Sequence, residues 1–242
     1  MDLRENILAT KRKVGASDCI GIKMKLFQLY ENTDIKNVAG TAKDIAQILQ
    51  NECSIAVDAY ARAHKVLYRG IKSVGASAAP FISASIRTER QPLYLPLELH
   101  NAVNEAMLEL GLKAHRGNSI FCTTRLSIAA NWGQTYVVFP VDGWVGTVFD
   151  KVVDGYVVDE ILDDAAWIMK SADDHDIKIQ KLAAKLSELE PYSFKSAEAL
   201  QLILKERYVD ILITGNKYYA LIFEKNSSED SLTNQVLKIL GI

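Results

Sequence analysis

Cysteine is scarce in this chain of 242 residues, and its three occurrences form no pattern. Cys19, Cys53 and Cys122 are odd in number and lack paired spacing. Disulfide frameworks and structural zinc sites both need cysteines at closely related spacings. The sequence therefore predicts neither, and a reducing cytoplasm is the compartment that fits it.

An excess of one charge and long apolar runs are also missing. The formal net charge is −2 at pH 7, which argues against binding of the whole surface to nucleic acid or anionic lipid. A local basic patch stays open. No stretch approaches the roughly 20 apolar residues that span a bilayer, and the N-terminus lacks an apolar signal core. We therefore expect a soluble cytoplasmic protein with no membrane partner.

The chain also lacks the glycine-rich phosphate loops of nucleotide-binding proteins, both G-x-G-x-x-G and the Walker pattern. The acidic stretch at 171–176 lacks the alternating ligands and the turn glycine of a calcium loop, so we interpret it as a solvated helix start. No metal site is predicted. The hydrophobic content of 49% nevertheless supports a substantial core.

The N-terminal part is predicted to be helical. Thr41 is a plausible N-cap with Asp44 at the third helical position, and apolar residues then recur at helical spacing as far as His64. We predict one long helix over 41–63 and one or two helices in residues 1–35. This gives a helical region at 1–63 and a catalytic domain at 64–242. The helical region is either a packing appendage or a cap or partner-binding element.

A first strand is predicted over Val66–Ile71 and contains Arg69 and Gly70. An arginine fork beside a glycine suits a pyrophosphate or ribose, because guanidinium binds oxyanions in pairs and glycine allows close approach. A surface or ion-paired arginine is the alternative. Residues 81–95 are predicted to form an ordered loop, whose Arg87 and Arg90 either contact phosphate or are solvated.

A second strand is predicted over 118–124, and a helix with a glycine stop follows at 125–133. Phe121, Thr123 and Thr124 lie on this strand, where threonine is also ordinary for β-structure. A third strand is predicted over 206–213 with Asp210 on it, followed by a turn and a return strand at 218–223. Each strand thus carries polar groups that a sheet could bring together.

This order of segments resembles the ADP-ribosyltransferase family, whose members cleave NAD and transfer ADP-ribose. The second segment is similar to the family's phenylalanine-x-serine-threonine-serine strand, with threonine for serine. The third is similar to its acidic-x-glutamate strand, with Asp210 at the glutamate position and Tyr208 at the preceding acidic one. Both substitutions at the acidic strand are departures, because aspartate is one methylene shorter than glutamate.

The resemblance implies an α+β fold with two packed, mainly antiparallel sheets around an NAD cleft. NAD would be the substrate, without a metal. The implied catalytic residues are Asp210, Thr123 and Arg69, and the implied cofactor-binding residues are Arg69, Gly70, Phe121, Thr123 and Thr124. The function implied is mono-ADP-ribosylation of an intracellular protein by a bacterial or phage effector, acting in the host cytoplasm if phage-encoded.

Two alternatives to that function remain open: an NAD glycohydrolase, and a degenerate module that binds NAD or protein without catalysis. For several other polar and aromatic residues, a structural role is the alternative to a functional one. Glu98 and His100 lie on a helix predicted from Pro96. A position on the solvated face of this helix is a simpler interpretation of both residues than a catalytic role. Trp144, Phe149 and Tyr156 either cover a ligand as an aromatic loop or pack in the core. A further helix is predicted over 159–169.

Overall fold

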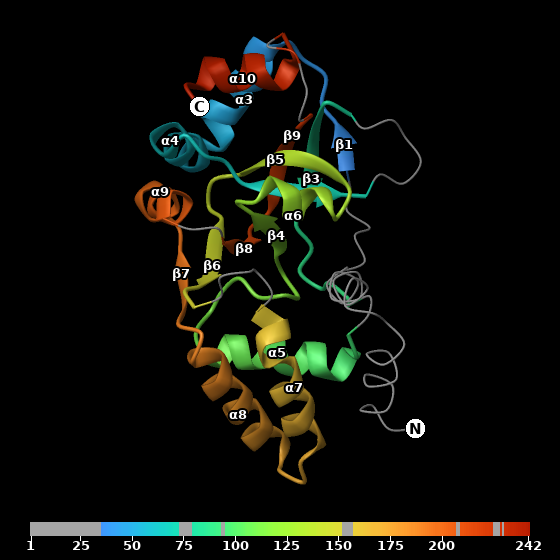
Figure 1. Cartoon of the computed structure of the whole chain (residues 1–242). Helices are drawn as coiled ribbons and strands as arrows, with labels where there is room; N and C mark the ends of the chain where they lie inside the picture. Colours follow the sequence, from blue (N-terminus) through green and yellow to red (C-terminus); the bar gives the residue numbers. More distant parts are fainter. Residues whose placement is uncertain are drawn as a thin grey trace.

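The computed structural model describes residues 35–72, 79–92, 95–151, 157–206, 209–224, 228 and 230–242. Within these ranges it has eight helices and nine strands, so the predicted α+β class is confirmed (Figure 1). The strands are β1 Ile35–Asn37, β2 Tyr68–Ile71, β3 Phe81–Ser85, β4 Ile120–Thr123, β5 Gln134–Pro140, β6 Val145–Phe149, β7 Pro191–Phe194, β8 Asp210–Thr214 and β9 Lys217–Ile222. The helices are α3 Ala42–Glu52, α4 Ser54–Ala63, α5 Leu97–Glu109, α6 Leu126–Ala130, α7 Val157–Lys170, α8 His175–Ser187, α9 Ala197–Glu206 and α10 Leu232–Leu240.

All nine strands of the described residues form one antiparallel sheet in the order β1-β3-β9-β5-β2-β4-β8-β6-β7. Two packed sheets were expected, and the structure differs because β2 and β4 pair with each other at the centre of the strand order. There β2 and β4 pair through a single register pair, Tyr68 with Thr123, whereas β2 pairs with β5 over four. The sheet therefore consists of two halves, β1-β3-β9-β5-β2 and β4-β8-β6-β7, joined by one narrow contact.

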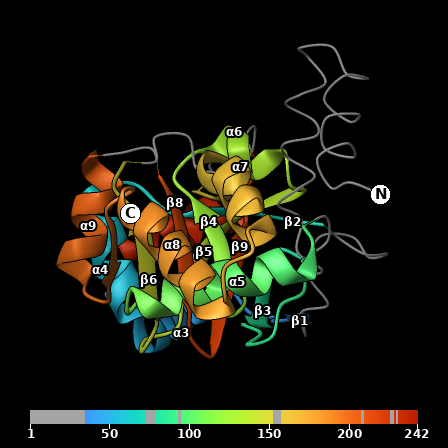
Figure 2. The same cartoon turned by 90° about the horizontal axis from the view of Figure 1, so that it is seen from below.

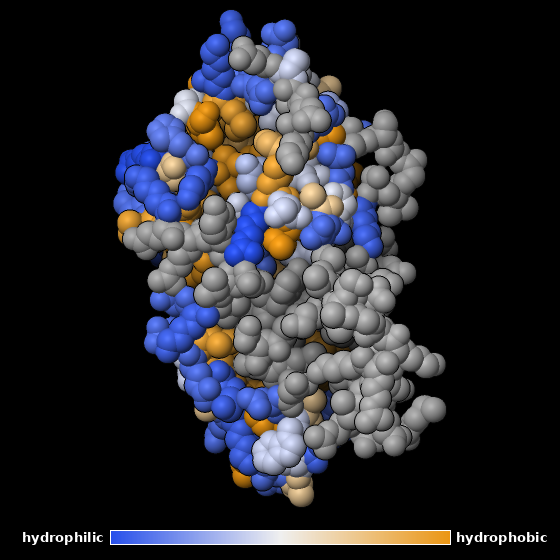
Figure 3. All heavy atoms as spheres, in the orientation of Figure 1, coloured by the Kyte–Doolittle hydropathy of each residue, from blue (hydrophilic) through white to orange (hydrophobic). Residues whose placement is uncertain are grey.

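One hydrophobic core spans both halves of the sheet. It contains Val137 and Leu221 from the first half and Ile120 and Ile211 from the second. The helices α3 and α10 contact each other at one end of the molecule, with α4 next to them, and α9 contacts α4 at the side of the sheet (Figure 1). The face in Figure 3 is mostly hydrophilic over α4, α8 and α9, as expected for helices that bury one side.

A separate helical unit of α5, α7 and α8 lies at the opposite end of the molecule (Figures 1 and 2). Its apolar residues form a second core with the sheet residues Leu212 and Phe149. The helices predicted from Pro96 and over 159–169 are confirmed as α5 and α7. Trp144 and Phe149 are buried in core clusters and do not form a loop over a ligand; Tyr156 lies outside the described residues.

The predicted helix over 41–63 is two helices with a break at Cys53. Thr41 forms the predicted capping box with Asp44 at the start of α3. The break is stabilised from a distance, because Asp142, between β5 and β6, accepts hydrogen bonds from the N–H groups of Ser54 (3.0 Å) and Ile55 (3.1 Å). A carboxylate there satisfies the free amides of a new helix N-terminus.

Two further strands differ from the sequence predictions. The segment predicted as a loop over 81–95 begins with β3, which pairs with β1 and β9. β1 lies in the region predicted to be helical, and residues 1–34 lie outside the described residues. The division at residue 63 stays a prediction, although Ile45, Leu49 and Tyr60 of the helices share the core of the sheet.

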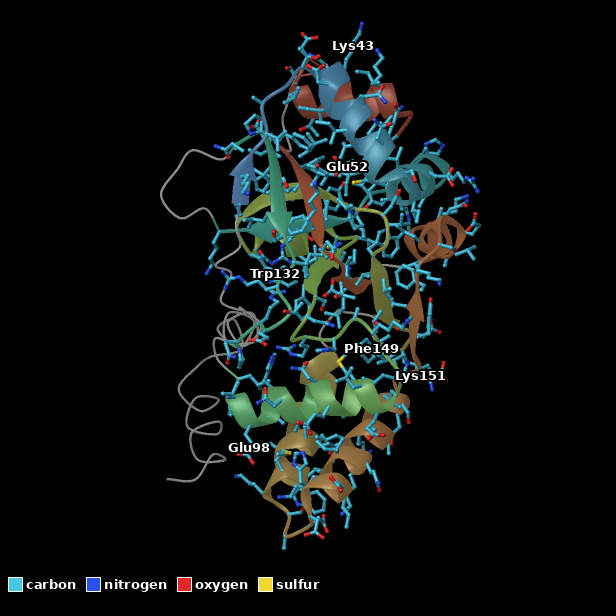
Figure 4. All side chains as sticks on the ribbon, turned by 180° about the vertical axis from the view of Figure 1, so that it is seen from behind. Lys43, Glu52, Glu98, Trp132, Phe149 and Lys151 are labelled. Carbon is cyan, nitrogen blue, oxygen red and sulfur yellow. The ribbon has the colours of Figure 1, made fainter. Side chains whose placement is uncertain are left out.

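Helix α6 packs directly on β2 at Gly70. A Cβ atom at Gly70 would lie 2.1 Å from the Ala129 carbonyl oxygen and 2.6 Å from Trp132 Cβ. Figure 4 shows Trp132 beside the sheet. We expect Gly70→Ala to lower the free energy of unfolding by about 1–3 kcal/mol, because α6 must move away from β2.

Urea denaturation followed by circular dichroism measures this change, and Gly40→Ala is the matched control. Gly40 is exposed, and a Cβ there would meet Asp44 Cβ at 3.3 Å and Ile45 Cγ1 at 3.6 Å, without the close backbone contact found at Gly70. Equal stability of the Gly70→Ala protein and the wild type would contradict the close packing of α6.

The capping carboxylate gives a second prediction. Asp142→Ala removes the acceptor of the Ser54 and Ile55 amides, so we expect a loss of about 1–2 kcal/mol in the free energy of unfolding. Asp142→Asn keeps one acceptor oxygen and should lose less. If both variants unfold at the wild-type urea concentration, Asp142 does not stabilise the start of α4.

Candidate functional site

The three predicted motif strands are neighbours at the centre of the sheet, in the order β2-β4-β8. Tyr68 on β2 faces Thr123 on β4, and Thr123 faces Asp210 on β8. Residues in direct register across a sheet point to the same face. Thr123 and Asp210 are therefore side by side, with Thr123 fully buried and Asp210 half-buried.

Arg69 points to the opposite face, because it follows Tyr68 on the same strand. Its guanidinium carbon lies 6.0 Å from the ring centre of Tyr218, whose register through β5 and β9 places it on that face too. Arg69 is 2% exposed, and its Nη1 donates to the Phe121 carbonyl at 2.7 Å. The structure thus brings together two of the three predicted catalytic residues and places the third behind them.

The two threonines hold backbone groups. Thr123 Oγ1 accepts a hydrogen bond from the Arg125 N–H at 3.1 Å, which fixes the turn from β4 into α6. Thr124 Oγ1 accepts from the Val209 N–H at 3.0 Å, which fixes the residue before Asp210. Each hydroxyl oxygen therefore has a role in shaping the site.

The remaining predicted ligand residues lie in packed surroundings. Gly70 is covered by α6. The Phe121 ring is partly buried against the second core and lies 5.5 Å from the guanidinium carbon of Arg116. Close packing against protein explains both residues without a ligand.

Two arginines bind backbone carbonyls on the side of β4 that faces β2. Alternate residues of a strand direct their backbone groups to opposite neighbours, and the Thr124 N–H bonds toward β8. The carbonyls of Ser119 and Phe121 consequently point toward β2. Arg90 Nη1 donates to the first and Arg69 Nη1 to the second. Guanidinium groups thus replace a partner strand where β2 and β4 diverge.

Arg90 connects the sheet to the helical unit and is neither solvated nor on a loop tip. Its N–H donates to the Gly117 carbonyl at 2.8 Å, and its own carbonyl accepts from His100 Nε2 at 3.0 Å. Burial lowers the pKa of Arg90 to about 9, and the nearby charge of Arg69 contributes. Arg87, by contrast, is exposed.

His100 is buried, so the expectation of a solvated residue is wrong for it, whereas Glu98 is exposed on α5 (Figure 4). The bond to the Arg90 carbonyl requires a proton on Nε2. Burial, and to a smaller extent the charge of Arg116, lower the pKa of His100 to about 4. His100 is therefore a neutral structural histidine at pH 7.

Thiol and metal chemistry find no support in the described part of the chain. Burial raises the pKa of the Cys122 thiol to about 12 and also raises that of Cys53, so neither forms a thiolate readily. Among the described residues no group of three or more histidine, cysteine, aspartate or glutamate side chains could hold a metal ion. None of the described helices is long and apolar enough to cross a membrane.

Sequence reasoning missed Tyr68 and Tyr218. Tyr68 is in register with Thr123 and is the site's neighbour on β2, and its ring contacts that of Phe223 with centroids 5.3 Å apart. The alternation of β2 puts Tyr68 and Arg69 on opposite faces, and this alternation could have been read from the sequence.

Comparisons of the chain with protein-family models, with curated proteins and with solved structures found no match.

The buried His100 predicts a pH dependence of stability. Its folded pKa of about 4 lies below the ordinary value of 6.5, so the unfolded chain binds the extra proton first as pH falls. The stabilisation is complete above pH about 6.5 and is lost toward pH 4, by an amount on the order of 3 kcal/mol.

His100→Gln keeps a donor for the Arg90 carbonyl but removes the titration. Its free energy of unfolding should therefore fall less than that of the wild type between pH 7 and pH 4.5 in urea titrations. His175→Gln, which replaces an exposed histidine and keeps His100, is the control for the general effect of losing one histidine. Parallel pH curves for His100→Gln and the wild type would contradict the buried neutral histidine.

Proposed function

We propose that this protein is an NAD-dependent mono-ADP-ribosyltransferase that modifies an intracellular protein, with Asp210 as the catalytic carboxylate. The observation that carries the proposal is the direct register of Thr123 and Asp210 on neighbouring central strands. The hydroxyl strand and the acidic strand of the sequence resemblance are thus adjacent, although 87 positions separate these two residues in the chain. A role as a bacterial or phage effector belongs to this proposal.

The position of Asp210 suits cleavage of the bond between nicotinamide and ribose. Nicotinamide leaves with the bonding electrons, positive charge develops on the ribose, and a nearby carboxylate stabilises it. The acceptor group of the target protein then forms the new bond to the ribose carbon and gives up its proton. Asp210 is half-buried, so part of its surface reaches outward while the protein limits the water around it.

The ADP-ribosyltransferase-like fold is also part of the proposal. Its support is the division of the sheet into two halves that meet at one register pair and share a core. In this proposal Arg69 acts from behind the site. It holds the Phe121 carbonyl of β4 and so keeps the hydroxyl strand in place against β2.

A non-catalytic module is the second candidate, and one observation favours it. The residues predicted to bind the NAD diphosphate and ribose, Arg69 and Gly70, are covered by protein. The NAD glycohydrolase shares the cleavage step of the transferase, with water as the acceptor. The three candidates therefore differ in two measurable steps, NAD cleavage and protein labelling.

Incubation with NAD labelled in its adenylate part, with and without a bacterial lysate, separates the candidates. The transferase predicts release of nicotinamide together with labelled protein. Nicotinamide release without labelled protein indicates a glycohydrolase, and binding of NAD without release indicates the non-catalytic module. Absence of both binding and release would overturn the NAD proposal altogether.

Asp210→Asn tests the catalytic residue. Because it removes the charge at nearly constant size, we expect turnover to fall at least about a hundredfold with little change in unfolding. Asp164→Asn is the control, since Asp164 is an exposed carboxylate on α7, and it should keep wild-type turnover. Unchanged turnover in folded Asp210→Asn protein would remove Asp210 from catalysis.

A further inference from the structure

The side chain of Thr124 completes the hydrogen-bond ladder between β4 and β8. Residues of a hydrogen-bonded antiparallel pair normally exchange two bonds between backbone N–H and carbonyl groups. Thr124 and Val209 form the first of these, from the Thr124 N–H to the Val209 carbonyl at 3.1 Å. The second runs from the Val209 N–H to Thr124 Oγ1 at 3.0 Å. A hydroxyl oxygen thus takes the place of a backbone carbonyl.

The local path of the chain explains this exchange. Directly after Thr124 the chain leaves β4, and Arg125 is the N-cap of α6 with φ −100° and ψ 110°. The Arg125 N–H is already bound by Thr123 Oγ1. At the end of β4 the Thr123 hydroxyl oxygen therefore binds the turn into α6, and the Thr124 hydroxyl oxygen binds the segment that leads into β8.

Val209 immediately precedes Asp210, the first residue of β8. With both backbone groups of Val209 bound to Thr124 and its side chain buried, the point where the Asp210 side chain leaves the backbone is fixed relative to Thr123. We infer that Thr124 is a positioning residue for the Asp210 carboxylate and does not contact NAD. This inference rests on the proposed function for its kinetic consequence.

The test compares Thr124→Val, which removes the hydroxyl at the same shape, with Thr124→Ser, which keeps it. In NAD cleavage, Thr124→Val should lower kcat at least about tenfold, because small misplacements of a reacting group are costly. KM should stay within about twofold, since no binding contact is lost. Thr124→Ser should restore most of kcat. If Thr124→Val does not fold, Thr124→Ala makes the same comparison without a branched side chain.

Thr214→Val is the matched control. Thr214 lies at the other end of β8 and donates its hydroxyl to the Asn118 carbonyl at 2.7 Å, so this variant loses one side-chain hydrogen bond between the same two segments. It should keep wild-type kcat. A raised KM with unchanged kcat in Thr124→Val would instead assign Thr124 to NAD binding, and an equal loss of kcat in Thr214→Val would reduce Thr124 to general strand stability. Either result overturns the inference.

A second readout separates this inference from the proposed function. The carboxyl titration of Asp210, followed by ¹³C NMR, needs no activity. Thr124→Val should shift its midpoint, while Thr124→Ser and Thr214→Val should leave it at the wild-type pH. If the wild type does not cleave NAD, the proposed function fails, and the titration alone decides. An unshifted midpoint in folded Thr124→Val protein then overturns the positioning role.

Discussion

Backbone carbonyls that point toward a diverging strand are the constraint on which this structure depends. In the described residues the backbones of β2 and β4 pair in register only at Tyr68 and Thr123, yet the carbonyls of Ser119 and Phe121 still face that side. Leaving such groups unsatisfied in a core costs about 1–3 kcal/mol each. Arg90 and Arg69 supply the missing donors, and their burial is the cost of joining two half-sheets around one core. The lowered pKa of Arg90 reflects this burial, because removal from water disfavours the charged guanidinium.

This constraint also places the candidate site. Because Arg69 occupies one face of the junction, the other face is left to Thr123 and Asp210, between α6 on β2 and the second half of the sheet. The hydroxyl oxygens of Thr123 and Thr124 at the end of β4 then accept hydrogen bonds from the N–H groups of Arg125, in the turn into α6, and of Val209, next to β8. A threonine pair that looks like ordinary strand composition thus has a specific use, since only a side-chain oxygen can continue a ladder after the backbone has turned away.

Local signals in the sequence predicted those elements whose causes are local. The capping box at Thr41, the helix from Pro96 and the strands around Arg69, Phe121 and Asp210 follow from neighbouring residues and were predicted correctly. The break at Cys53 depends on Asp142, which lies far along the chain, and β3 depends on pairing with β9. The face taken by Arg69 relative to Asp210 depends on register between strands. A shift of one residue reverses every side chain of a strand, so spacing alone could not decide it.

The arginine bridges have a mechanical consequence. A backbone ladder holds two strands at a nearly fixed angle, whereas a guanidinium group on a chain of rotatable bonds follows its acceptor through small rotations. Between β2 and β4 there is one backbone register pair, and beyond it the arginine side chains donate hydrogen bonds to the carbonyls of β4 and of Ser119 just before it. The angle between the two half-sheets at this junction is therefore held by side chains and by the shared core, and less by backbone hydrogen bonds than the angles within either half.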